Sequence, residues 1–222
     1  VMTPTFFTMN NIINVIRQAS YTAIASIGMT MVIIIGEIDL SAGSLIAVSG
    51  LVSAWIFKTT GSLVFSFAGA IAVGIVVGLF NGFLTAKGEL PGFIATLASM
   101  TILRGLAYIL TGGDPISVSD NRYLRLGTGY VSFIPIPVII MVICVLFGSF
   151  VLNKTRFGRY IYAVGGNAEA SKWSGLNVGK VKILVYLIMG VLTSIAGLIV
   201  SARLGSGQPS AGQNFEMDCI TA

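Results

Sequence analysis

Long apolar stretches alternate with short polar ones along the chain. A helix that crosses a bilayer needs about 20 mostly apolar residues. The second apolar stretch is short for a full span, so we expect either a partial span or a helix that shares membrane depth with the irregular stretch before it. The pattern predicts an all-α fold, a polytopic transmembrane helix bundle. Its six apolar segments lie at about residues 12–35, 44–57, 62–86, 93–110, 131–152 and 181–202.

The third apolar segment carries a small residue at every fourth position: Ala70, Gly74, Gly78 and Gly82. In a helix this spacing places the four residues on one face. A second helix backbone can approach such a face closely within a membrane. We interpret the stripe as a packing surface. Asn81 lies beside it and is a candidate to hydrogen-bond a neighbouring helix.

Composition supports a membrane protein surrounded by lipid. Of the 222 residues, 55% are hydrophobic and 9% are charged, whereas soluble domains contain about 25% charged residues. Histidine is absent, which excludes the catalytic mechanisms that depend on it. The glycine-rich stretch 205–212 lacks the Lys-Ser/Thr pair of a P-loop. We therefore expect no catalytic residues, no metal site and no cofactor in this chain, and its basic residues do not indicate nucleic-acid binding.

The distribution of charge predicts an orientation. Six of the 13 basic residues fall between positions 153 and 182, where Glu169 is the only acidic residue. Short cytoplasmic loops carry such an excess of Lys and Arg, so we place 153–182 in the cytoplasm. Counting spans from there places 87–92 in the cytoplasm too. By the same count, the external segments are 58–61, 111–130 and the chain after 202.

The stretch GEIDLSAGS, residues 36–44, places two acids between apolar segments. It has the composition of a break at membrane depth, because Gly36 and Gly43 free the backbone. Asp39 has two open interpretations, a cap for the following helix or a functional acid. Glu37 has no comparable structural role in the sequence, so it is a functional candidate unless it reaches the membrane interface.

Arg104 interrupts the fourth apolar segment. A charge well inside a span costs about 2.5–3.5 kcal/mol on insertion scales, so this side chain is expected to face the interior of the bundle. One interpretation is an internal ion pair with Glu37 or Asp39, and the other is a polar lining for a solute path. Our candidates for residues that line such a path are Asp39, Asn81, Thr96 and Arg104.

Within the basic loop, the stretch NAEASKWSG predicts a short helix outside the bilayer. Asn167 is a candidate N-cap and Gly175 a candidate helix stop. On physical grounds alone, a solvated amphipathic connector explains this helix as well as a mechanical role does.

Four stretches together resemble the membrane permease subunits of the ribose-type ABC importers, which take up simple sugars. GEIDLSAGS is similar to that family's GGIDLSVGS motif, with Glu37 at a position where the family usually has Gly. The other three stretches are residues 91–117, 155–183 and 201–222. Together the four cover most of the chain.

The resemblance implies a pair of permease subunits, homodimeric or heterodimeric, in the bacterial inner membrane. It also implies two copies of a separate ATPase subunit that holds ATP and Mg²⁺, and a periplasmic or lipid-anchored sugar-binding protein. The stretch NAEASKWSG would be the coupling helix that docks on the ATPase, with Asn167, Glu169, Ala170 and Gly175 as its key positions.

The same resemblance implies that residues 1–222 form a single permease domain lacking one N-terminal span and several C-terminal spans. Asp39 matches the family's acid. Glu37 is then peculiar to this chain and is expected either to pair with a basic residue or to impair the protein, so we expect Glu37→Gly to be harmless or to improve assembly.

Alternative functions remain open from the sequence. A permease of the same wider family for branched-chain amino acids or for a sugar-like signal molecule fits the same stretches. An ATP-independent carrier or channel is a further alternative, although we find no internal repeat of the kind that many carriers show.

Overall fold

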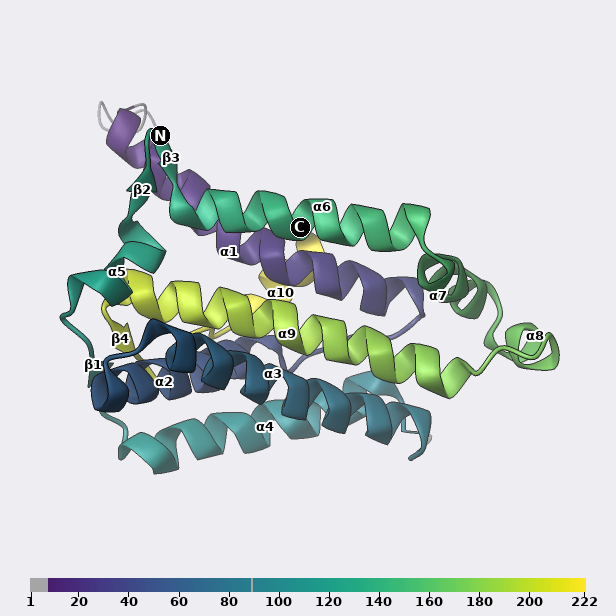
Figure 1. Cartoon of the computed structure of the whole chain (residues 1–222). Coiled ribbons are helices and arrows are strands. Elements are labelled where there is room, and N and C mark those ends of the chain that lie inside the picture. Colours follow the sequence, from purple (N-terminus) through teal and green to yellow (C-terminus); the bar gives the residue numbers. More distant parts are fainter. Residues whose placement is uncertain (1–7, 89) are drawn as a thin grey trace.

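The computed structural model describes residues 8–88 and 90–222 and shows a bundle of helices (Figure 1). Position 89, in the predicted 87–92 loop, and positions 1–7 lie outside the described residues. The long helices are α1 (Met9–Ile34), α2 (Ala42–Thr60), α3 (Leu63–Ala86), α4 (Gly92–Thr111), α6 (Ile136–Lys154) and α9 (Val178–Leu204). They correspond one to one to the predicted apolar segments, so the all-α prediction is confirmed.

Shorter elements connect these helices. The short helices are α5 (Asn121–Thr128), α7 (Arg156–Gly166), α8 (Ala168–Trp173) and α10 (Phe215–Thr221). Two-residue strands form two antiparallel pairs, β1 (Ile116–Ser117) with β4 (Ser206–Gly207) and β2 (Tyr130–Val131) with β3 (Ile134–Pro135).

Five of the described helices, α2, α3, α4, α6 and α9, are long and apolar enough to cross a membrane. Helix α2 has 19 residues, so the predicted segment 44–57 was too short, and the helix is long enough for a full span. Helix α1 has 26 residues but does not reach the same apolarity, because Arg17 and Gln18 lie in its first half.

Helices α2 and α9 form the centre of the bundle and are the most buried of the five apolar helices. Helices α1 and α6 lie on one side of α9, and α3 and α4 lie on the other (Figure 1). The predicted small-residue stripe of α3 packs against α9. A Cβ atom on Gly78 would lie 2.5 Å from the Tyr186 carbonyl oxygen, and one on Gly82 would lie 2.8 Å from the Ile183 Cα. The stripe is therefore a packing surface, as predicted.

The loops gather at two ends of the bundle, as the charge pattern predicted. One end holds α7, α8, the α3–α4 connection and the start of α9, and we call it the basic end (Figure 1). The opposite end holds α5 and the strand pairs (Figure 1).

The chain beyond α9 differs from the prediction of an external stretch. After β4, residues 208–214 turn back into the bundle, and we call them the re-entrant segment. Gly212 packs directly against Gly43 at the start of α2, and α10 then lies against α1 and α2. The expectation was wrong for residues 208–221 because small residues let this irregular backbone approach α2, and side-chain donors satisfy its carbonyl groups.

Candidate functional site

The turn that precedes α2 is organised by Asp39. Its Oδ1 atom accepts hydrogen bonds from the Ser41 backbone N–H at 2.8 Å and from the Ser41 hydroxyl at 2.6 Å. The carboxylate therefore stabilises the turn before the helix, and it does not bond to an N–H group inside α2. Of the two interpretations of Asp39, the structure supports a local structural role close to the predicted cap.

Asn81 and Thr96 join this turn to α3 and α4. The Asn81 amide donates to the Ser41 hydroxyl at 2.9 Å and accepts from the Ser99 hydroxyl at 2.5 Å. The Thr96 hydroxyl accepts from the Leu40 backbone N–H at 3.0 Å. Three of the four candidates for the solute path, namely Asp39, Asn81 and Thr96, thus meet around the start of α2.

These three side chains are almost completely inaccessible in the single chain, with exposed fractions of 3%, 1% and 0% for Asp39, Asn81 and Thr96. Each makes hydrogen bonds within the chain, so together they form a buried network that holds α2, α3 and α4 together. Their role in lining a solute path stays a prediction.

Arg104 lies apart from this network, and the predicted ion pair with Glu37 or Asp39 was wrong. Its Nη1 atom donates to the carbonyl oxygens of Pro209 and Ala211, each at 2.7 Å. The start of α4, where Glu37 binds, is about 18 Å away along the helix axis. Arg104 instead satisfies the backbone of the re-entrant segment, a partner that no sequence pattern pointed to.

Glu37 contacts two other elements at the basic end. Its Oε1 atom pairs with the Lys182 Nζ atom of α9 at 2.5 Å, which confirms the expectation of a basic partner. Its Oε2 atom accepts from the backbone N–H of Gly92, the first residue of α4, at 2.7 Å. A carboxylate at this position satisfies an unpaired donor of the helix start and interacts favourably with the helix dipole.

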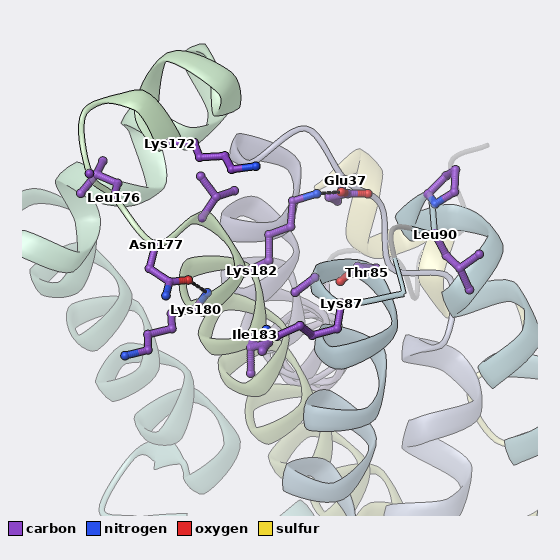
Figure 2. Close-up of a pocket in the computed structure, with 15 residues that line it drawn as sticks. Glu37, Thr85, Lys87, Leu90, Lys172, Leu176, Asn177, Lys180, Lys182 and Ile183 are labelled. Carbon is purple, nitrogen blue, oxygen red and sulfur yellow. Dashed lines mark hydrogen bonds and ion pairs between the residues drawn. The ribbon is translucent and has the colours of Figure 1, made fainter.

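The ion pair borders a cavity of about 1100 Å³ at the basic end (Figure 2). The end of α3, the α3–α4 connection, the α8–α9 connection and the start of α9 line it. Four lysines line it together with Glu37, so the walls carry excess positive charge: Lys87, Lys172, Lys180 and Lys182.

Helix α8 coincides with the predicted coupling helix. The Asn167 side chain caps it by accepting from the Ala170 backbone N–H at 2.8 Å. Gly175 has φ +82° just beyond the last turn, a conformation that favours glycine. The predicted cap and stop are thus both confirmed.

The outward face of α8 is open. Glu169 and Ala170 are exposed, and Trp173 is 86% exposed at the basic end. An exposed tryptophan is typical of a surface that binds another protein. Sequence reasoning had not singled out Trp173. No group of His, Cys, Asp or Glu side chains within residues 8–88 and 90–222 is arranged to hold a metal ion.

Comparison with known proteins shows similarity along the whole chain. Residues 11–222 match the family described as branched-chain amino acid transport system / permease component. The chain is 43% identical to the ribose import permease protein RbsC of Haemophilus influenzae and 44% identical to that of Escherichia coli (strain K12), covering 100% of this chain and 70% of each relative. The xylose transport system permease protein XylH of Haemophilus influenzae is 34% identical, over 98% of this chain and 74% of the relative. No solved structure matches the chain.

Proposed function

We propose that this chain, which belongs to the family of branched-chain amino acid transport system permease components, is the membrane permease subunit of an ATP-driven importer for a simple sugar of the ribose type. Its family and the five long apolar helices among the described residues make it a multi-pass protein of the bacterial inner membrane. It is a transporter subunit rather than an enzyme.

The observation that carries the proposal is the similarity to ribose import permeases over the full length of this chain. The open face of α8 at the basic end fits the same function, because a short capped helix outside the apolar spans offers a rigid docking surface to a soluble partner. In this scheme Asn167 and Gly175 fix the two ends of α8, while Glu169 and Ala170 lie on the helix that contacts the ATPase.

Transport then proceeds by alternating access between two permease copies, with residues 1–222 acting as one domain in each. The ATPase subunits bind and hydrolyse ATP with Mg²⁺, and their closure moves α8. A periplasmic or lipid-anchored binding protein delivers the sugar from outside and sets most of the selectivity. Asp39, Asn81, Thr96 and Arg104 remain our candidates for the polar groups along the path.

A second candidate substrate class is a branched-chain amino acid, which the family description favours. Pentoses other than ribose are also candidates, because relatives named for xylose and L-arabinose transport are 34% and 38% identical to the chain.

The test is uptake by proteoliposomes that contain the permease with its ATPase and binding-protein subunits. We expect uptake of radiolabelled ribose that requires ATP and is unaffected by excess leucine. ATP-dependent uptake that leucine abolishes would support the amino-acid alternative. Uptake that persists without ATP would contradict the importer function.

A further inference from the structure

We propose that Glu37 is a positioning residue that transmits movement of the coupling helix to the start of α2 and the start of α4. This inference rests on the proposed function, because it concerns how ATPase movement reaches the membrane helices. The unit consists of Glu37, the Lys182 ammonium and the Gly92 backbone N–H, and we call it the Glu37 bridge.

The bridge joins three elements that are distant in the sequence. Glu37 lies in the connection between α1 and α2, Gly92 begins α4, and Lys182 lies in the second turn of α9. The contact with α4 is close, because a Cβ atom on Gly92 would collide with the Glu37 Oε2 atom and with the Tyr186 hydroxyl oxygen. A displacement of the α9 start therefore acts on both other elements through one carboxylate.

The bridge is linked to the coupling helix α8 through the connection between α8 and α9. The connection between α8 and α9 consists of the α8 cap Ser174, Gly175, Leu176 and the α9 cap Asn177. The Leu176 backbone N–H donates to the Ser171 carbonyl oxygen at 3.0 Å, which ties this connection to α8. Lys172 of α8 also extends toward the ion pair (Figure 2).

The bridge is linked to the buried network of Asp39, Asn81 and Thr96 through the backbone that follows Glu37. Two residues after Glu37, Asp39 holds the turn before α2. The Ile38 carbonyl oxygen accepts from the Thr96 hydroxyl at 3.2 Å, and the Leu40 N–H bonds to the same side chain. The stretch that carries Glu37 is thus hydrogen-bonded to α4 on both sides of Asp39, and any shift of Glu37 is passed to α2 and α4 together.

The surroundings of the Glu37–Lys182 ion pair strengthen it and leave space for the elements around it to move. The side chains of Lys182 and Glu37 are 22% and 12% exposed, so solvent screens their attraction less than at an open surface. The adjoining cavity of about 1100 Å³ leaves room for the α8–α9 connection to shift. The bridge also argues against the expectation that Glu37→Gly is harmless, because that change removes both contacts.

The test is the number of ATP molecules hydrolysed per sugar transported, measured with the complete importer in proteoliposomes. Glu37→Gln keeps an acceptor for Gly92 but removes the charge, and Lys182→Met removes the ammonium. We expect each change to raise this ratio roughly fivefold or more, the scale of typical coupling between sites. The double variant should be no worse than either single one, because both changes break the same interaction.

Lys180→Met is the matched control. Lys180 lines the same cavity and lies on the same helix, but its side chain points away from Glu37 (Figure 2). We expect an unchanged ratio for this variant. A merely structural ion pair would lower the melting temperature of the Glu37 and Lys182 variants and leave the ratio unchanged, and that result would overturn the proposal.

Failure of the proposed function and failure of the Glu37 bridge would give different results. An unmodified importer without ATP-dependent sugar uptake would contradict the proposed function and, with it, the proposed role of the bridge. An active importer whose ratio is insensitive to both charge removals would contradict the bridge alone. If the Glu37→Gln variant does not assemble, the ratio measured for Lys182→Met tests the bridge instead, because that change breaks the same ion pair from the α9 side.

Discussion

Gly74 of α3 and Gly190 of α9 face each other so closely that a Cβ atom on either one would collide with the carbonyl oxygen of the other. Neither clash can be relieved by a side-chain rotation, because the obstructing atoms belong to the backbone. The contact lies within the small-residue stripe and fixes the distance between α3 and α9. Close helix packing of this kind replaces the hydrophobic driving force that membrane helices lack.

We predict that Gly74→Ala lowers the stability of the bundle by about 1–3 kcal/mol, the usual cost of overpacking. The melting temperature of the purified protein in detergent measures the change. Gly105→Ala in α4 is the control, since its Cβ atom would meet no atom within 4 Å. A Gly74 variant as stable as the Gly105 variant would contradict the close contact between α3 and α9.

Arg104 supports the re-entrant segment, and this leads to a second prediction. Arg104→Met keeps most of the side-chain length but leaves the Pro209 and Ala211 carbonyl oxygens without their donor. An unsatisfied buried polar group costs about 1–3 kcal/mol. We expect limited proteolysis to cut within residues 208–214 faster in this variant than in the unmodified protein.

The control for this measurement is Arg122→Met. Arg122 pairs with Asp120 at the surface, with 64% of its side chain exposed, so its loss should leave proteolysis unchanged. Equal cleavage of the Arg104 and Arg122 variants would show that Arg104 does not hold the re-entrant segment.

The sequence was sufficient to predict local features, because each depends on neighbours along the chain. The apolar segments, the α3 stripe and the caps of α8 at Asn167 and Gly175 are features of this kind. The sequence did not predict which residues distant along the chain pair with each other. Lys182 lies 145 positions from Glu37, and many lysines could have reached that acid.

The position of the re-entrant segment was missed for a related reason. Its residues are small and polar, so its composition is typical of an external loop. The packing of Gly212 against Gly43, the packing of Ala211 against the apolar core and the two hydrogen bonds from Arg104 hold it inside. The apolar pattern likewise did not predict that the start of α2 is buried among α3, α4 and this segment.

Asn81 provides a third prediction, on the buried network. Asn81→Ala removes the acceptor of the Ser99 hydroxyl and one of the two hydrogen bonds of the Ser41 hydroxyl, which still donates to Asp39. We expect a loss of about 1–3 kcal/mol for the Ser99 hydroxyl left without its partner. Asn153→Ala is the control, because Asn153 is exposed and its amide donates to Ser149 of its own helix. A melting temperature equal to that of the control would show that the network does not stabilise the start of α2.

The same variant separates stability from solute binding. If Asn81 serves only the network, the concentration of sugar that gives half-maximal uptake should stay the same in the protein that does assemble. A change in that concentration without a change in melting temperature would place Asn81 on the solute path.

The N-cap of α8 leads to the last prediction. Asn167→Ala removes the hydrogen bond to the Ala170 backbone N–H, and loss of an N-cap typically costs about 1 kcal/mol. A six-residue helix has few other internal bonds to hold it together, so fraying of its first turn should displace Glu169 and Ala170. We therefore expect weaker capture of the permease by its tagged ATPase subunit in detergent, with normal insertion into the membrane. Ser174→Ala is the matched control, because the Ser174 hydroxyl, at the C-terminal end of the same helix, donates to the Ala170 carbonyl oxygen and its loss leaves the Ala170 N–H capped by Asn167. If both variants are captured as well as the unmodified protein, α8 is not the surface that binds the ATPase, whereas a loss confined to Asn167→Ala ties that binding to the folded first turn.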